Sequence, residues 1–286
     1  FKFSPELKPV RLTILDQFKA ERVDPLQGSG IMEVPDNQYL ILIQSNENLG
    51  FAGGNNLAIK SVLNSADPPE FIFLLNNDTW VDPDCLTHLI ETATKERASV
   101  VGSLVKDQSG KRILFAGDSR RPEFFYKKPR PYTPDLTHDE PAMMACGCAV
   151  LVQRSALINF KDHFGYFLNP KLFLYGEETD FCLKAKKLGH KIYVSKKAVV
   201  YHKDKSNSRE NHRYLLTLYY MSRNAIFIAN NVLSGFWLIY FHVIYPLARI
   251  KVCLMKLIRG RWDEARTIFE GLYDGYRGLS GKWSKQ

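Results

Sequence analysis

The stretch Phe71-Ile-Phe-Leu-Leu-Asn-Asn-Asp-Thr79 decides the fold class. Its first five residues form a continuous apolar run, which is typical of a strand buried on both faces of a sheet. A similar run lies at 39–44, and helical patterns follow the two runs at 57–63 and 83–90. Strands that alternate with helices in this way predict an α/β fold with a doubly wound, mostly parallel sheet flanked by helices.

Other apolar and amphipathic runs extend this alternation along the chain. The polar, proline-rich stretch 107–141 interrupts them and predicts surface loops on the substrate side of an enzyme. We expect the further elements to be a weak helix at 5–24, strands at 100–105, 145–153 and 191–201, and a helix at 177–188.

The composition is that of an ordinary globular protein, with 286 residues, 45% hydrophobic and 24% charged. It excludes a disordered tail, a collagen-like chain and a multi-span membrane protein. The 39 Lys and Arg residues exceed the 30 Asp and Glu residues, which gives a formal charge of +9. This surplus favours polyanionic partners such as phosphates or an acidic membrane surface. The basic residues are scattered rather than gathered in one stripe, so we expect no nucleic-acid partner.

The five cysteines form no CxxC pair, which favours reduced thiols in a cytoplasmic protein over a disulfide framework. Cys146 and Cys148 flank Gly147, and on a strand their side chains would face the same way. Two alternatives stay open for this pair: a close dithiol, or two small core residues. The chain begins Phe-Lys-Phe-Ser without a signal peptide, and the missing initiator Met favours a processed or truncated chain.

Asp78 follows directly after the carboxyl end of a predicted buried strand. Ligands of open parallel sheets bind there, because the loops diverge and leave a crevice. A lone carboxylate at this point can hold Mg²⁺ or Mn²⁺, which fills its shell with water and diphosphate oxygens. Asn76 and Asn77 can add neutral oxygens or amide donors. The structural alternative is an Asx-turn or a helix cap.

A glycine-rich loop at 46–56 also follows a predicted strand. Gly50, Gly53 and Gly54 permit positive φ angles and a close approach of the backbone to a ligand. The spacing is neither that of a dinucleotide fingerprint nor that of a phosphate-binding P-loop. The structural alternative is a tight turn from a strand into a helix.

Three carboxylates begin the helix predicted at 177–188. Glu177 and Asp180 share one helix face, with Glu178 beside them. Acidic residues in a first turn partly complement the helix dipole. Crowded carboxylates also raise one another's pKa, which suits a general base that must deprotonate a hydroxyl. His202 ends a later strand and is either a metal ligand or an ordinary surface histidine.

In their order and spacing, these segments resemble the family 2 glycosyltransferases of the GT-A fold. The resemblance covers roughly residues 40–225 and is strongest to the bacterial rhamnosyltransferase-like branch that builds O-antigens and other surface polysaccharides. It rests on Ile43-Gln44 with 48–56, Leu75-Asn-Asn-Asp-Thr79, 147–154, 173–180, Tyr201-His-Lys203 and Tyr219-Tyr-Met-Ser-Arg-Asn224.

The resemblance implies a role for each matching residue. Asp78 stands at the last position of the family's metal-binding DxD triplet and would bind Mg²⁺ or Mn²⁺ on the donor diphosphate, with His202 as second ligand. Glu178 would be the catalytic base and Glu177 the second choice, while Asp180 would orient an acceptor or a basic neighbour. The donor-side residues would be Asn48, Gly50, Gly53, Gly54, Asn55, Asn76 and Asn77, and Gly147 and Cys148 would lie on the acceptor side.

The implied activity is an inverting, metal-dependent transfer of a sugar from a dTDP- or UDP-linked donor, with dTDP-rhamnose expected. The acceptor would be a saccharide or a lipid-linked saccharide. The family's two opening motifs are missing, so we expect a GT-A-like domain over 1–225 that lacks its first strand. In the alternative, Leu12-Thr-Ile-Leu15 with Asp16 supplies that strand. The rival function is a non-catalytic or truncated nucleotide-sugar-binding domain.

A C-terminal helical appendage is expected over 226–286. Its segment 232–248 is almost continuously apolar and aromatic, and basic residues follow it at once. This pattern describes an interfacial helix held to anionic lipid, which would place a cytoplasmic protein on the inner face of the plasma membrane. The alternative is a helix packed into the core.

Overall fold

The structure, a computed structural model, describes residues 11–21, 39–118, 121–126, 136–203 and 212–285. Parts of two predictions, the weak helix at 5–24 and the loops at 107–141, therefore lie outside the described residues.

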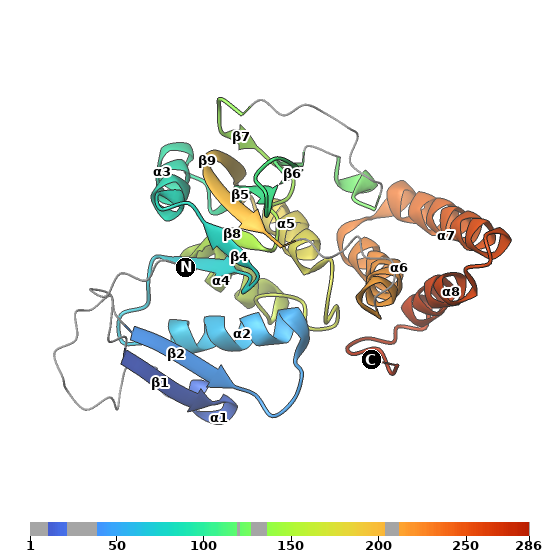
Figure 1. The fold of residues 1–286 in the computed structure, drawn as a ribbon, viewed down its shortest axis with the longest axis horizontal. Coiled ribbons are helices and arrows are strands. Elements are labelled where there is room, and N and C mark those ends of the chain that lie inside the picture. Colours follow the sequence, from blue (N-terminus) through green and yellow to red (C-terminus); the bar gives the residue numbers. More distant parts are fainter. Residues whose placement is uncertain (1–10, 22–38, 119–120, 127–135, 204–211, 286) are drawn as a thin grey trace.

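The central sheet is built from strands that are distant in the sequence (Figure 1). Its order is β3-β8-β5-β9-β4, while β6 pairs with β5 and β7 pairs with β9. The strands are β3 (Phe71–Leu75), β4 (Thr79–Val81), β5 (Val100–Asp107), β6 (Ile113–Phe115), β7 (Glu140–Pro141), β8 (Ala149–Gln153) and β9 (Ile192–His202).

The described strands form mixed rather than mostly parallel sheets, which corrects one part of the predicted fold. Among the strands that the structure describes, only β5 with β9, and β1 (Arg11–Asp16) with β2 (Tyr39–Gln44), pair in parallel. Strands β3 and β5 both pair antiparallel to β8, and β4 pairs antiparallel to β9. Antiparallel neighbours need no crossover helix, and the described residues between β5 and β8 form only the short elements β6, η2 (Pro122–Phe124) and β7. The α/β class, the flanking helices and the helical C-terminal part are confirmed.

The described N-terminal segment is a strand, not the expected weak helix. Strand β1 (Arg11–Asp16) pairs in parallel with β2 (Tyr39–Gln44), as the alternative interpretation of 12–16 predicted. Leu12 and Leu15 have a spacing that also fits a helix face, and only the pairing with β2 distinguishes the two. Helix α1 (Gln17–Ala20) follows, and Asp16 caps it by accepting a hydrogen bond from the amide of Lys19 at 2.8 Å.

Helices cover both faces of the central sheet. On β8, Leu151 packs against the α3 side, whereas Val150 and Val152 pack against α4 and α5, because side chains alternate along a strand. Leu89 of α3 and Phe160 of α4 are fully buried in these two cores. The helices on and around the sheet are α2 (Gly50–Leu63), α3 (Cys85–Glu96), α4 (Arg154–Phe164) and α5 (Glu177–Lys187), with a short 3₁₀ turn η2 (Pro122–Phe124).

Three C-terminal helices pack together beside α5 (Figure 1). They are α6 (His212–Val232), α7 (Gly235–Ile258) and α8 (Trp262–Tyr276). Their core includes Leu172 and Leu183, which belong to the sheet-bearing part of the chain. Helix α6 runs through residue 225, and the division into 1–225 and 226–286 stays a prediction.

Helix α7 has one packed face and one exposed face. Phe241 is fully buried and Tyr245 nearly so, as the core-helix alternative predicts. Phe236 is 68% exposed and Ile258 is 86% exposed, at opposite ends of an apolar stripe along the other face. The stripe comprises Phe236, Ile239, Val243, Leu247, Ile250, Leu254 and Ile258. Within the described ranges, α7 alone has the length and apolar composition to cross a membrane.

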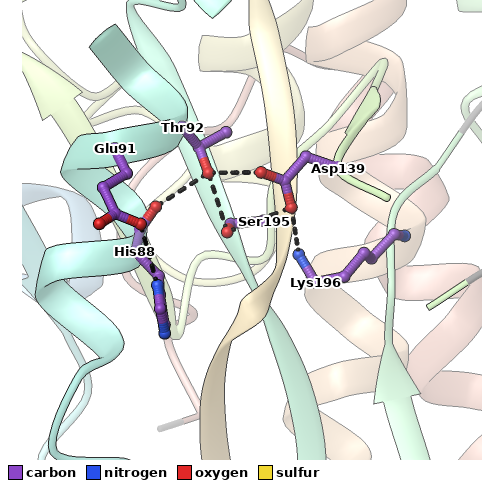
Figure 2. A network of polar contacts seen from close by, with 6 residues as sticks. All are labelled: His88, Glu91, Thr92, Asp139, Ser195 and Lys196. Carbon is purple, nitrogen blue, oxygen red and sulfur yellow. Dashed lines mark hydrogen bonds and ion pairs between the residues drawn. The ribbon is translucent and has the colours of Figure 1, made fainter. Parts of the chain in front are cut away.

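A polar network ties the described end of the 107–141 loops to the sheet (Figure 2). The Asp139 carboxylate lies 2.7 Å from Thr92 Oγ1 on α3 and accepts the backbone N–H of Lys196 at 2.8 Å. Thr92 Oγ1 also lies 2.9 Å from Ser195 Oγ on β9. This loop end is therefore fixed at the α3 side of the sheet.

Candidate functional site

Asp78 and His202, the two predicted metal ligands, lie close together at the end of the sheet. Asp78 lies in the turn between β3 and β4, and Thr79 pairs with His202 in the β4–β9 register. His202 Nε2 lies 3.2 Å from Asp78 Oδ1, and both side chains are partly exposed. The backbone N–H of Lys203 donates to the Asp78 carbonyl at 3.0 Å, which fixes the turn against β9.

The donor set at this point fits a divalent ion that keeps most of its shell for a substrate. A carboxylate and an imidazole are two protein ligands, and Mg²⁺ or Mn²⁺ commonly takes one or two with water and phosphates completing the shell. No group of three or more His, Cys, Asp or Glu side chains fit to hold a metal occurs among the described residues. Asp78 and His202 could therefore hold an ion only together with a ligand such as a diphosphate.

The turn at 146–149 lies between Asp78 and the acidic helix. The amide of Asn76 donates to the Cys148 carbonyl at 2.9 Å, which joins this turn to the Asn76-Asn77-Asp78 turn. The sulfurs of Cys146 and Cys148 lie 3.3 Å apart as a close dithiol, while Cys148 also belongs to a hydrophobic core against which Cys146 packs, so both alternatives describe the pair. The hydrogen bond between the two thiols lowers the pKa of Cys146 and raises the pKa of Cys148.

Glu178 lies against the other side of the same turn. A Cβ placed on Gly147 would come within 3.3 Å of Glu178 Cβ and 3.5 Å of its Oε2, so the glycine allows the carboxylate to approach. A cavity of about 20 Å³, room for roughly one water, lies beside Glu178 and is lined mainly by apolar side chains, Phe51 and Leu74 among them. Burial raises the pKa of Glu178, against hydrogen bonds from its own backbone and that of Gly176.

The other two acids of helix α5 point into the protein. Glu177 is almost fully buried, and its Oε1 has no hydrogen-bond partner in the part of the chain that is described. Burial, followed by the charge of Glu178, raises the pKa of Glu177 to about 8. Asp180 is fully buried, 2.7 Å from Lys184 Nζ, and Lys184 also donates to Tyr166 at 2.7 Å. Asp180 therefore forms an ion pair with a basic neighbour, and its role in the site stays a prediction.

The predicted glycine loop is mostly helix, because α2 begins at Gly50. Gly50 has φ 69° and lies so close to the 173 backbone that a Cβ would come within 2.3 Å of the Phe173 carbonyl. Phe51 donates its amide to that carbonyl at 2.7 Å, and Asn48 Oδ1 accepts from Gly50 at 3.0 Å. The structural alternative, a tight strand-to-helix turn, thus describes this segment. Of the other proposed donor-side residues, Gly54 and Asn77 are exposed and Asn55 bonds within its own helix.

The segment 171–176, which leads into helix α5, is held in a strained conformation. Phe173 and Tyr175 have φ angles of 65° and 66°, a region that costs non-glycine residues about 1–3 kcal/mol each. The side-chain amide of Asn224 donates to the carbonyls of Leu172 at 3.0 Å, Leu174 at 2.9 Å and Tyr175 at 2.6 Å. Helix α6 therefore fixes the backbone that presents Glu178.

Arg223 supports the same segment from within the core. It is almost fully buried, and its guanidinium donates to the carbonyls of Leu172 at 2.7 Å and Gly281 at 2.6 Å. The guanidinium also lies 4.8 Å from the ring centroid of Tyr220. Sequence reasoning placed Arg223 and Asn224 in a family motif but assigned them no role, although a paired Arg-Asn on an apolar helix is a sign of buried polar contacts.

The motifs and the family comparison identify the class of protein. The model of the family described as "Glycosyl transferase family 2" matches residues 31–160, a range that contains Asp78 and the 146–149 turn. Residues 31–160 thus belong to glycosyl transferase family 2, and the family expectation is confirmed. The acidic helix and His202 lie outside the matched range.

Individual relatives point the same way in sequence. The chain is 23% identical over 255 residues to the low-salt glycan biosynthesis hexosyltransferase Agl10 of Haloferax volcanii, covering 87% of this chain and 76% of Agl10. Among solved structures, GalNAc-T7 with UDP, GalNAc and Mn²⁺ gives a TM-score of 0.43 at 17% identity, over 58% of this chain and 32% of that one. Residues 1–349 of S. aureus TarS in complex with UDP-GlcNAc give a TM-score of 0.45 at 16% identity, over 85% of this chain and 66% of that one. The chain spans about a third of GalNAc-T7 and just under two thirds of that TarS chain.

Proposed function

We propose that this glycosyltransferase performs an inverting, metal-assisted transfer of a hexose from a nucleotide sugar to a saccharide acceptor. One observation supports this most directly: the 146–149 turn brings Glu178 and Asp78 to the same end of the sheet. The Cys148 carbonyl accepts a hydrogen bond from the Asn76 amide on one side of the turn, and Gly147 lies against Glu178 on the other side. A leaving-group site and a base on either side of one turn are what a single displacement requires.

In this mechanism Glu178 is the general base. Its pKa is raised by burial, so the carboxylate is a stronger base than an exposed glutamate. It takes the proton from an acceptor hydroxyl as that oxygen attacks the anomeric carbon from the face opposite the leaving diphosphate. The displacement needs no nucleophile from the enzyme. Glu177 remains the second choice, although its burial keeps it from an incoming sugar.

The donor in this proposal lies on the Asp78 side. Asp78 and His202 would hold Mg²⁺ or Mn²⁺, and the bound ion would supply positive charge beside the nucleoside diphosphate leaving group. Asn76, Asn77, Asn48 and the first turns of α2 line the donor. dTDP-rhamnose follows from the resemblance to the rhamnosyltransferase-like branch, and a UDP-hexose is the other candidate.

The acceptor in this proposal is lipid-linked and is reached from the cytoplasmic face of an anionic membrane. The exposed apolar stripe of α7 supports a helix that lies in the interface, and exposed Lys251 and Arg259 can contact anionic headgroups. Flotation with phosphatidylserine vesicles tests this. We expect Val243→Asp to weaken binding and Ile158→Asp, an exposed isoleucine on α4, to leave it unchanged. Equal binding of the two variants would contradict the membrane role.

A screen of nucleotide sugars by thermal shift, with and without Mn²⁺, tests the transfer itself. We expect stabilisation by one donor that depends on the metal, followed by release of the nucleoside diphosphate when an acceptor is present. Asp78→Ala should remove the metal-dependent shift, and Glu178→Gln should keep the shift but lose turnover. Asp67→Asn, an exposed carboxylate, is the control. Donor binding without any hydrolysis or transfer would favour the non-catalytic binding domain.

A further inference from the structure

The two cysteines of the 146–149 turn form a pair that the proposed mechanism does not use. Their sulfurs lie 3.3 Å apart, and a disulfide would bring them about 1.3 Å closer. The turn is closed by a hydrogen bond from the Ala149 amide to the Cys146 carbonyl at 3.1 Å. Cys146 is partly exposed, whereas Cys148 is buried. An oxidant in solution would therefore meet Cys146 first.

We propose that Cys146 and Cys148 are a modification site, at which a peroxide closes a reversible disulfide that switches the transferase off. The effect on turnover rests on the proposed function, whereas the chemistry of the two thiols does not.

The reaction has two steps. The Cys146 thiol gives up its proton, and its sulfur attacks one oxygen of hydrogen peroxide. The O–O bond breaks, a sulfenic acid forms at Cys146, and the leaving hydroxide takes up that proton to become water. Cys148 sulfur then attacks the Cys146 sulfur, the S–O bond breaks, and hydroxide leaves with the Cys148 proton as a second water. Two thiols are oxidised to one disulfide as one peroxide is reduced to two waters. A dithiol such as dithiothreitol reverses this by thiol–disulfide exchange.

The position of the pair explains why oxidation would affect the site. Gly147 lies between the two cysteines and directly against Glu178, and the Cys148 carbonyl holds the Asn76 amide. We expect closure of this short loop to shift the backbone at 146–148, so that both contacts move with it. A misplacement of about 1 Å in a catalytic site can cost on the order of 100-fold in rate.

Peptide mapping after peroxide treatment tests the thiol chemistry. The wild type, Cys146→Ser and Cys253→Ser are treated with hydrogen peroxide, alkylated with iodoacetamide and digested. Cys253 is the matched control, because it is also a partly exposed thiol but lies on α7. We expect a 146–148 disulfide in the wild type and in Cys253→Ser, which dithiothreitol removes. Alkylation of both thiols, or over-oxidation of Cys146 without a disulfide, would overturn the proposal.

Two further measurements separate the possible failures. Phenylarsine oxide, a trivalent arsenical, should bind the untreated wild type one to one through both sulfurs, and it should not be retained by Cys146→Ser. Turnover should fall on the order of 100-fold with the disulfide and recover on reduction. A mapped disulfide with unchanged turnover would overturn the switch. If the reduced protein turns over no donor at all, the proposed function fails, while the mapped disulfide stands or falls on its own.

Discussion

Replacing Asn224 by alanine should both destabilise the protein and disturb its acidic helix. The side-chain amide of Asn224 reaches the carbonyls of Leu172, Leu174 and Tyr175. Leu172 would keep a partner in the variant, because Arg223 also donates to its carbonyl. The other two carbonyls lose their side-chain donor. An unsatisfied buried carbonyl costs about 1–3 kcal/mol, and since these two are only partly buried, we expect a loss of about 2–4 kcal/mol.

The same change should lower turnover by more than the loss of folded protein explains. Phe173 and Tyr175 hold positive φ angles only while the surrounding contacts oppose their relaxation. Without the Asn224 contacts, the 171–176 segment could relax and the first turn of α5 could move. Glu178 lies in that turn. We therefore expect a lower kcat at a temperature where the variant is still folded.

Urea unfolding and steady-state turnover of the same samples measure the two effects. Asn231→Ala is the matched control, because Asn231 is also on α6 and donates to a backbone carbonyl, that of Phe227 at 2.8 Å, but it is exposed. We expect the control to stay within about 0.5 kcal/mol of the wild type. If Asn224→Ala loses no more stability than the control, or if its kcat is unchanged, the side chain of Asn224 does not position helix α5.

Three further predictions concern buried or partly buried polar groups. Glu177 has a raised pKa in the folded protein, near 8, so its contribution to stability is full below its ordinary pKa of 4.5 and is lost as the pH rises through 8. The free energy of unfolding of the wild type, measured from pH 5 to 9, should therefore fall with pH, and Glu177→Gln should reduce this fall by about 2–4 kcal/mol. Lys184→Met leaves the buried Asp180 carboxylate unpaired and should cost about 3–5 kcal/mol at pH 7, less at low pH where Asp180 is protonated. Asp139→Ala removes the centre of the network in Figure 2 and should lower the free energy of unfolding in urea by about 2–4 kcal/mol, whereas Glu91→Ala, at the exposed edge of that network, should not.

The sheet strands could be predicted well where the sequence itself encodes burial. The runs at 39–44 and 71–75 are continuous apolar segments between turn formers, and β2 and β3 have those bounds. Strand β1 could not be separated from a helix, because six residues with apolar side chains three apart satisfy both periods. Strand direction was also out of reach, since an apolar run has the same pattern in parallel and antiparallel pairs.

The sequence indicates which residues lie in the candidate site, but it does not indicate the backbone contacts that hold them in place. Asp78 lies in the turn after β3 and His202 ends β9, so their convergence follows from a sheet whose strand ends share an edge. The close contact of Gly50 with Phe173 depends on a backbone conformation that no side-chain pattern reveals. The sequence predicts that Gly50 makes room for a ligand, whereas in the structure it makes room for the backbone of Phe173.

The C-terminal helices cannot be treated as a detachable membrane anchor. Arg223 of α6 bonds the carbonyls of Leu172, before the acidic helix, and of Gly281, after α8. Tyr245 of α7 donates to the Met221 carbonyl at 3.0 Å from within the same core. Deleting 232–286 would expose this core and remove the Gly281 contacts to Arg223 and Lys171, so lost vesicle binding and lost turnover would have one cause. Single substitutions that place a charge on the exposed stripe of α7, such as Val243→Asp, leave these contacts intact. These substitutions therefore distinguish a membrane-binding role of α7 from a structural role in supporting the site.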